Sequence, residues 1–596
     1  MLELDNILVL LILIGAVVLF VTEKLRVDVV AMLVLLALVA TGLVSVQEAL
    51  SGFASPAVVT VWAVFIISAG LSISGVADSI AQAMLKLVGQ SERRLLLLLM
   101  LMVGLMSAFM NNIGAVAILM PAVISIGRKL QIPTSRLLMP LAFAALLGGN
   151  MTLIGTPPNI LATDIMATYG VEPFGFFDFL PTGLLALAIG IAYMMLVGRF
   201  LLPDRTPVGD LSRQYRVRDF LTELRIGERS SLLGQTLSET GIGENFDLNV
   251  LYVRHQNKVL VSALESYQLA HGDVLLLEGA PQDIVNARRR YRLQDVDDWT
   301  AVQWRPEGDA DEFHLAEVTL APNSRFENKS LKEIGFRKHY SLSVLAIRHK
   351  GQEHVASLGD LSLQFGDSLL VQGPSEKFDQ LLNDPDLMAL ESPKVELRRT
   401  RKARSALAIL LVVVVLAATG LFPIAPLMLA GAMAMVVTQV ISMEEAYRAI
   451  DWKAVFLIAG MLPLGIAMET SGTAQLLAEQ VVRWTGSWGV IVVLACVFIM
   501  TALLTEVVSN AAATVLMVPI AIDVAFSLAV NAQPFVMATV LAASTSFLTP
   551  VGHQVNVLVF GVGGYKFSDY GRLGVGLNLL MLLLVVTVLP LIWPLY

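Results

Sequence analysis

The chain has 596 residues, of which 56% are hydrophobic and only 15% are charged, and its formal net charge is −8. Soluble globular proteins do not carry such an apolar excess, so the composition excludes a chain that is soluble as a whole. Runs long and apolar enough to cross a bilayer recur along the sequence. They lie near 5–22, 29–44, 58–76, 179–198, 405–420, 453–468, 486–504 and 573–594. We therefore expect an all-α, polytopic integral protein of the cell membrane.

The first run, near 5–22, lacks a basic n-region and a small-residue cleavage site, so we predict a spanning helix there rather than a signal peptide. The single cysteine, Cys496, lies in an apolar run, which excludes disulfides and cysteine metal sites. Residues 201–404 hold 27 of the 41 Lys and Arg and 31 of the 49 Asp and Glu. This segment is predicted to be a soluble, cytoplasmic insert between two membrane halves, residues 1–202 and 404–596.

The insert contains a duplication. VLYVRHQNKVL at 250–260 matches VLAIRHKGQEH at 344–354, and HGDVLLLEG at 271–279 matches FGDSLLVQG at 365–373, both at an offset of 94 residues. Each copy reads as alternating strands, a short polar helix and a GD turn into a final strand. We predict two small α+β domains in tandem, residues 203–300 and 301–403.

The two membrane halves also match each other. MNNIGAVAILMPAVI at 110–124 matches VSNAAATVLMVPIAI at 508–522, and MTLIGTPPNIL at 151–161 matches FLTPVGHQVNVLVFG at 547–561. With the insert in the cytoplasm, the distribution of Lys and Arg requires the segments 95–127 and 486–529, which contain the first motif of each half, each to enter and leave the membrane on one side. The halves are then inverted repeats, each with a re-entrant helical hairpin.

Polar residues mark the tips of both predicted hairpins, Asn111–Asn112 and Ser509–Asn510. An unsatisfied amide in hydrocarbon is costly. As an alternative to a binding site, an Asn pair can hold packed helices together by hydrogen bonds, and the GTPPN segment can be a helix kink caused by proline. Because both features recur at matching places in the two halves, we favour a binding site. Broken helices that expose backbone groups to an ion are the architecture of secondary transporters.

Four motifs in order, MNNIGA, TLIGTPPN, VSNAAAT and TPVGHQVN, resemble those of the divalent anion:sodium symporters, the dicarboxylate and sulfate transporters. The resemblance covers both membrane halves. It implies a secondary active transporter that holds one sodium ion per repeat and clamps a small divalent anion between the tips, with sodium as the coupling ion and no other cofactor. The implied sodium ligands are Ser107, Asn111, Asn112, Gly155, Thr505, Ser509, Asn510 and Gly552. The implied substrate contacts are Asn112, Thr156, Asn510, His553 and Gln554.

The sequence departs from the family pattern at positions that are expected to determine substrate specificity. Ile113 and Ala511 replace both motif threonines, and His553–Gln554 stands where dicarboxylate carriers have Thr-Pro. An imidazole and an amide can donate hydrogen bonds to a compact oxyanion, and relatives with RCK-type inserts look like sulfate carriers. Sulfate is therefore favoured over a C4-dicarboxylate. Glu506, an ionisable group in a hairpin, either couples protons to transport or braces the hairpin.

Each copy in the insert resembles the C-terminal RCK module of potassium-channel and potassium-uptake regulatory proteins. The resemblance implies a homodimer, in which the insert either responds to a cytosolic small-molecule effector or only stabilises the dimer. Two alternatives for the whole chain are an RCK-regulated ion channel and a transporter-like sensor. The absence of a TVGYG-like filter from the sequence argues against the channel. We expect neither an enzyme nor a nucleic-acid-binding protein, since no nucleophile–base constellation, HExxH or P-loop occurs.

Overall fold

The computed structural model divides the chain into two compact units, Met1–Thr206 with Pro393–Tyr596, and Pro207–Ser392. We call them the membrane unit and the insert, and describe each by itself. The structure describes residues 4–22, 25–76, 91–130, 132–204, 221–246, 248–255, 258–260, 267–278, 281–295, 313–321, 324–340, 342–349, 352–354, 358–374, 377–378, 381, 384–389 and 402–596.

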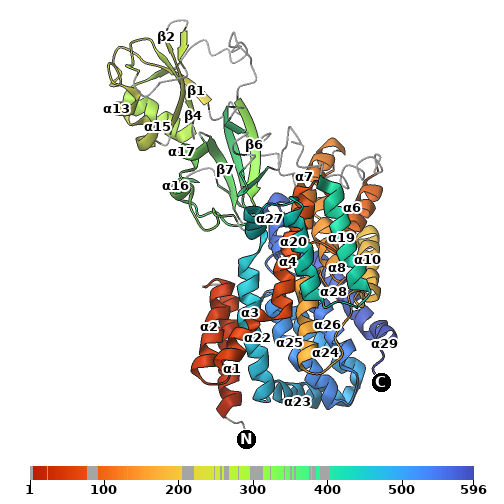
Figure 1. Cartoon of the computed structure of the whole chain (residues 1–596). Coiled ribbons are helices and arrows are strands. Elements are labelled where there is room, and N and C mark those ends of the chain that lie inside the picture. The colour runs from red at the N-terminus through yellow and green to blue at the C-terminus, as the bar shows by residue number, and fades with distance from the viewer. Residues whose placement is uncertain are drawn as a thin grey trace. The chain divides into compact units, whose positions relative to one another are not determined.

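The regular elements described in the membrane unit are helices (Figure 1). Those of the first half are α1 (Leu4–Thr22), α2 (Val27–Ala40), α3 (Val46–Ala54), α4 (Pro56–Ile73), α6 (Glu92–Ser107), α7 (Asn112–Leu130), α8 (Ser135–Gly149), α9 (Pro157–Thr168), α10 (Leu180–Tyr193) and α11 (Arg199–Leu201). Those of the second half are α19 (Ala403–Ala418), α20 (Ile424–Val437), α21 (Met443–Ala449), α22 (Trp452–Thr470), α23 (Thr473–Thr485), α24 (Val490–Thr505), α25 (Asn510–Ser527), α26 (Ala532–Ser544), α27 (Gln554–Val562), α28 (Phe567–Thr587) and α29 (Leu589–Ile592).

Within the described residues, six helical stretches are long and apolar enough to cross a membrane. They are Leu4–Thr22, Val46–Ile73, Leu180–Leu201, Trp452–Thr470, Asn510–Ser527 and Phe567–Ile592. The first and last expose large aliphatic side chains, such as Leu11, Ile14, Leu579 and Leu583, as helices facing lipid do. By contrast, α8, α25 and α26 are almost wholly enclosed by other helices. The prediction of a polytopic, helical integral membrane protein is confirmed.

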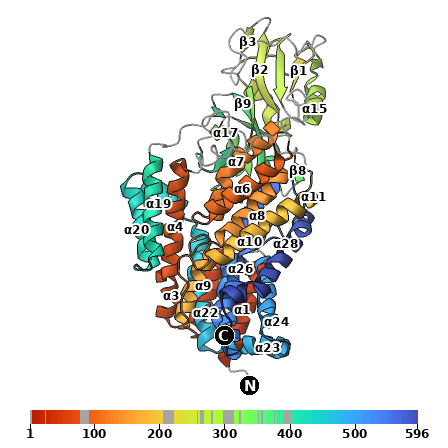
Figure 2. The ribbon, with the colours of Figure 1, turned by 90° about the vertical axis from the view of Figure 1, so that its right-hand side faces the viewer.

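The two halves interlock through equivalent helix pairs. Helix α2 packs against α22 of the second half (Figure 1), and its counterpart α20 packs against α4 of the first (Figures 1 and 2). Within the halves, α6 packs against α8 as α24 packs against α26. Across them, α27 contacts α8 and α9 contacts α26. Segments far apart in the sequence therefore form one body, with α8 and α26 at its centre.

The predicted hairpins are helix pairs with a short break. Helix α6 ends at Ser107 and α7 begins at Asn112, while α24 ends at Thr505 and α25 begins at Asn510. Local side chains restart the helices: Asn111 Oδ1 accepts a hydrogen bond from the Ile113 N–H at 3.1 Å. Likewise, Ser509 Oγ accepts from the Ala512 N–H at 3.4 Å. Both breaks follow from polar, helix-capping residues inside apolar runs.

The insert contains two antiparallel sheets with the same strand order. The first, in the order β3-β2-β4-β1-β5, consists of β1 (Leu221–Arg225), β2 (Asn249–His255), β3 (Lys258–Leu260), β4 (Val274–Glu278) and β5 (Gln294–Asp295). The second consists of β6 (Phe313–Leu320), β7 (Ser343–His349), β8 (Gln352–His354), β9 (Ser368–Pro374) and β10 (Leu387–Ala389). Its order, read from the edge that corresponds to β3, is β8-β7-β9-β6-β10. The short helices between strands are α13 (Leu237–Thr240), α14 (Ile242–Phe246), α16 (Leu331–Ile334) and α17 (Phe336–Tyr340).

The 94-residue offset seen in the sequence holds in the structure. Strand β7 starts and ends 94 residues after β2, and a bulge interrupts both strands at equivalent positions. A buried aspartate accepts a hydrogen bond from its own GD turn and pairs with a histidine in each copy, Asp273 with His255 and Asp367 with His349. The sequence reading missed α15 (Pro281–Tyr291), which follows β4, because that segment is short and polar. Two small antiparallel sheets are thus confirmed, whereas the predicted domain boundaries remain predictions.

Close backbone contact between α6 and α8 depends on a pair of small residues. A Cβ built on Gly148 would lie 2.1 Å from the Gly104 carbonyl oxygen, too close for any side chain. We expect Gly148→Ala to force the helices apart and to destabilise the protein by about 1–3 kcal/mol, the usual cost of overpacking. Thermal unfolding of the purified protein in detergent would measure this.

The matched control is Gly465→Ala in α22, where an added Cβ meets no atom within 4 Å. It should leave the midpoint unchanged or raise it, since alanine favours helix over glycine. Equal midpoints for the two variants would show that the α6–α8 contact is not tight.

Candidate ion and anion sites at the helix breaks

Two interruptions of helical structure lie in each half. Besides the hairpin break, the chain is unwound at 150–156 between α8 and α9, and at 545–553 between α26 and α27. Polar side chains at these interruptions are buried: Ser107, Asn112, Thr152, Thr156, Asn159, Thr505, Glu506, Thr545, Ser546 and Asn556. Because buried polar groups need partners, their hydrogen bonds define what each interruption can bind.

Three predicted sodium ligands of the first half lie together. The Ser107 hydroxyl donates a hydrogen bond to Asn112 Oδ1. A Cβ built on Gly149 would lie 2.7 Å from Asn112 Oδ1 and 3.3 Å from the Gly155 carbonyl oxygen, so both oxygens approach the same point on α8. We call Ser107, Asn112 and Gly155 the first oxygen cluster. Its oxygens are all uncharged.

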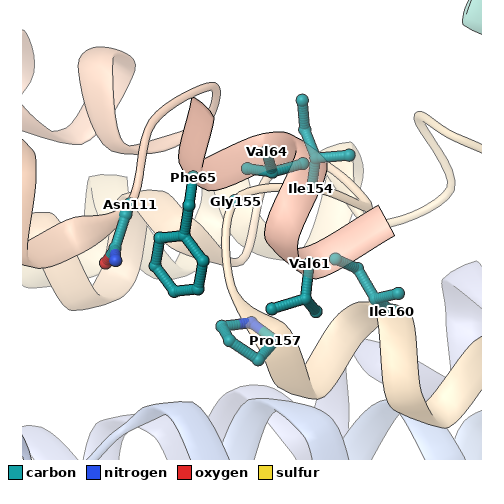
Figure 3. A pocket seen from close by; sticks show the side chains of 8 residues that line it. All are labelled: Val61, Val64, Phe65, Asn111, Ile154, Gly155, Pro157 and Ile160. Carbon is teal, nitrogen blue, oxygen red and sulfur yellow. The ribbon is translucent and has the colours of Figure 1, made fainter. Parts of the chain in front are cut away.

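Asn111, the fourth predicted ligand, makes other contacts. Its side chain caps α7, and its backbone N–H donates to Ser68 Oγ of α4 at 3.2 Å. Together with Gly155 it lines a small cavity of about 20 Å³, which is room for one water molecule. The other walls are apolar side chains around the break (Figure 3): Val61, Val64, Phe65, Ile154, Pro157 and Ile160.

A second cluster occupies the equivalent place in the second half. Thr505 Oγ1 donates to the Ala543 carbonyl at 2.8 Å and lies 3.2 Å from Ser546 Oγ. A Cβ built on Gly552 would lie 2.8 Å from Glu506 Oε2 and 3.0 Å from Ser546 Cβ. We call Thr505, Glu506, Ser546 and Gly552 the second oxygen cluster. Unlike the first, it contains a carboxylate.

Ser509 and Asn510, also predicted ligands, are engaged at the start of α25. The serine caps the helix, and Asn510 Oδ1 accepts a hydrogen bond from the Ala511 N–H at 2.8 Å. Both side chains are partly exposed, unlike Ser107 and Asn112. The two hairpin tips thus differ in how they use their asparagines.

An asparagine in each half holds the unwound loop in place. Asn159 Nδ2 donates to the carbonyls of Gly149 at 3.2 Å and Thr152 at 2.7 Å. Asn556 Nδ2 does the same with Ser546 at 2.7 Å and Thr549 at 3.3 Å. The sequence comparison aligned these asparagines but gave them no role. Each one satisfies two carbonyls that the helix break leaves free.

Threonines tie each loop to the hairpin tip opposite. Thr152 Oγ1 donates to the Ala108 carbonyl, and Thr549 Oγ1 donates to the Glu506 carbonyl at 3.4 Å. In the second half Glu506 adds a further tie, because its carboxylate accepts hydrogen bonds from the Leu548 and Thr549 N–H groups, each at 2.8 Å. Tip and loop are therefore one connected unit in both halves.

The predicted anion contacts lie at helix N-termini. Thr156 and His553 are the N-cap residues of α9 and α27 and have nearly the same backbone angles, φ −148° and −149°. The Thr156 hydroxyl is buried without a hydrogen-bond partner among the described residues, whereas His553 Nδ1 accepts from the Val555 N–H at 3.1 Å. Gln554 is exposed. Helix N-termini favour anions, so these positions suit an anionic ligand.

The ligand chemistry of the clusters favours a hard cation. Hydroxyl, amide and carbonyl oxygens suit alkali and alkaline-earth ions rather than transition metals. Throughout the described parts of the chain, no group of three or more His, Cys, Asp or Glu side chains could hold a metal ion. The assignment of individual sodium ligands stays a prediction.

Buried, broken helices in a body of apolar helices define the class, an integral membrane transporter. The chain belongs to the citrate transporter family, whose profile matches residues 17–542. It is 38% identical to the uncharacterized transporter sll0640 of Synechocystis sp., over 97% of this chain and 95% of the relative. It is 35% identical to the uncharacterized transporter YfbS of Escherichia coli, over 97% and 98%. Sodium/sulfate cotransporter 1 of Chlamydomonas reinhardtii is 26% identical, over 55% of this chain and 39% of the relative.

Membership of this family makes the chain a secondary transporter of an anion and not an enzyme. This family membership also agrees with the resemblance of the four sequence motifs to those of anion transporters.

The loop-holding asparagines give a direct test of this geometry. Asn159→Leu and Asn556→Leu keep the branched shape of the side chain, with larger methyl groups in place of the amide, but leave two buried carbonyls without a donor, at a cost of about 1–3 kcal/mol for each unsatisfied group. We expect both variants to unfold at temperatures several degrees below wild type. Asn578→Leu in α28 is the control, because its amide has no hydrogen-bond partner among the described residues. A control as unstable as the other two would refute the role of these bonds.

Proposed function

We propose that the chain is a sodium-coupled symporter of a small divalent anion, with sulfate favoured over a C4-dicarboxylate. The observation that carries the proposal is the paired arrangement of the breaks, in which each half brings a hairpin tip against an unwound loop. In this proposal the halves are inverted repeats and the hairpins are re-entrant, so the breaks meet near the middle of the membrane.

The first and second oxygen clusters would each hold one sodium ion. The first cluster buries hydroxyl, amide and carbonyl oxygens close together, and the second buries two hydroxyls beside a carboxylate. Oxygen ligands of these types are those that such an ion prefers. Sodium coupling is also supported by the similarity to the sodium/sulfate cotransporter of the green alga. The remaining predicted ligands, Asn111, Ser509 and Asn510, would join when the tips close on substrate.

The anion would lie between the N-termini of α9 and α27, near Thr156 and His553. The dipoles of both helices attract negative charge there, although α9 begins with Pro157 and Pro158, which have no N–H to donate. A compact oxyanion is favoured, because the unpartnered Thr156 hydroxyl and the His553 imidazole can donate hydrogen bonds to it. Asn112, Asn510 and Gln554 complete the proposed contacts.

The insert is proposed to be a pair of RCK-like regulatory domains in the cytoplasm, in a homodimer. It joins the end of the first half to the start of the second, the two parts that move against each other in alternating access. A ligand of the insert can bias that equilibrium by as much as its affinity differs between the conformations.

Uptake of radiolabelled sulfate into proteoliposomes tests the function. A symporter gives saturable uptake that requires an inward sodium gradient and is lost when choline replaces sodium. Succinate as a competitor distinguishes the two anion classes. A channel would instead conduct sulfate without sodium, and a sensor would bind it without uptake. Either of those results would replace the proposal.

The hairpin-tip asparagines should be essential for transport. Asn112→Ala and Asn510→Ala each remove a proposed ligand of both sodium and the anion, so we expect uptake to fall at least a hundredfold in a folded protein. Asn531→Ala, at an exposed N-cap of α26, is the control and should transport normally. Near-normal uptake by either tip variant would refute the tip assignment.

Replacing residues 206–400 with a flexible Gly/Ser linker should leave sodium-dependent uptake measurable, because the proposed ligands all lie outside this segment. The response of uptake to an ultrafiltrate of cytosol, which contains its small molecules, should disappear. In wild type the size of this response should be about 5- to 150-fold, the usual range of allosteric coupling. Loss of uptake in a well-folded deletion would mean that the insert is structural, and the regulatory proposal should then be dropped.

A further inference from the structure

The carboxylate of Glu506 is buried in the second oxygen cluster. The residue is 6% exposed and follows directly after the end of α24. Its two oxygens accept one backbone hydrogen bond each, from Leu548 and Thr549 at 2.8 Å. These bonds show that Glu506 braces the loop, which was one of the two roles considered from the sequence.

Bracing alone does not account for the charge. Among the ion pairs found in the described residues, none includes Glu506. An ionised carboxylate away from water is costly unless a cation compensates it. Hydrogen bonds from the loop at 547–549 stabilise the carboxylate but leave its net charge in place. In its ionised form, Glu506 therefore leaves the second cluster short of one positive charge.

The first half shows that the brace can be built without this charge. Thr152 ties its loop to the carbonyl of Ala108, as Thr549 ties its loop to the carbonyl of Glu506. Ala108 thus occupies the place of Glu506 in the first half. Since tip and loop are joined in both halves, the carboxylate is an addition specific to the second.

The carboxylate also faces the proposed ion ligands. It adjoins Thr505 in the chain, and a Cβ on Gly552 would lie 2.8 Å from Glu506 Oε2. Any larger residue at 552 would crowd this carboxylate, so glycine lets the backbone lie close to it. A sodium ion among the second cluster's oxygens would lie within a few ångströms of this carboxylate.

We propose that Glu506 supplies the counter-charge of the second sodium site, which makes the two sodium sites unequal. The inference rests on the proposed sodium-coupled function. An empty second site leaves a negative charge that repels a divalent anion, whereas an occupied site is neutral. The first site, built from uncharged oxygens, binds sodium more weakly and becomes attractive to the anion when filled.

Sodium-dependent thermal stabilisation of the purified full-length chain tests this, with choline chloride keeping the ionic strength constant. Glu506→Gln removes the charge, and we expect the sodium concentration for half-maximal stabilisation to rise by about ten- to a hundredfold, as loss of a charge a few ångströms from the ion implies. Glu506→Asp keeps the charge but shortens the brace, so its midpoint should stay much closer to wild type. Glu469→Gln, an exposed carboxylate near the end of α22, should change nothing.

The same assay separates this inference from the function on which it rests. If wild type responds to sodium and Glu506→Gln responds at the same concentration, the counter-charge role is wrong and the sodium-coupled function stands. Equal shifts in the Gln and Asp variants would assign Glu506 to bracing alone and overturn the inference. A wild-type protein that does not respond to sodium would overturn both.

Discussion

The structure depends on one constraint: backbone groups freed by a helix break inside a membrane protein cannot be left without partners. Each half of the chain breaks two helices and meets this constraint with the same two side chains. An asparagine at the third position of a short helix, Asn159 or Asn556, donates to two loop carbonyls. A threonine in that loop donates to the hairpin tip. These bonds hold the loops that contain Gly155 and Gly552 against the hairpins, so the proposed ion sites depend on them.

The two halves share these hydrogen bonds and differ in the residues that surround them. Position 149 is glycine in the first half and its counterpart is Ser546 in the second, and the N-cap is Thr156 in one and His553 in the other. Ala108 is matched by Glu506. The first cluster is therefore neutral and the second is charged. Duplication supplied the geometry, and the substitutions made the two sites chemically distinct.

Much of this could be predicted from the sequence, because polar residues inside apolar runs mark the places where helices break. The positions of both hairpin breaks follow from such residues, and the repeat of the insert follows from sequence matches at a constant offset of 94 residues. Helix α23 was missed since it is amphipathic rather than apolar, with Glu479 and Arg483 on one surface. Helices α3 and α21 were missed although Ser45 with Glu48 and Ser442 with Glu445 are capping boxes visible in the sequence.

The bonds of the site could not be predicted in the same way. Asn159 donates to carbonyls seven and ten residues earlier in the chain. These carbonyls come within reach of its side chain only because the unwound loop folds back on itself. The sequence also left Glu506 between two roles, because its partners lie more than forty residues away on another loop.

The most direct test of the central claim is to count the sodium ions bound per chain in the purified protein, at saturating sodium and sulfate. The paired clusters predict two. A count of none, or of one that persists at saturation, would contradict the account.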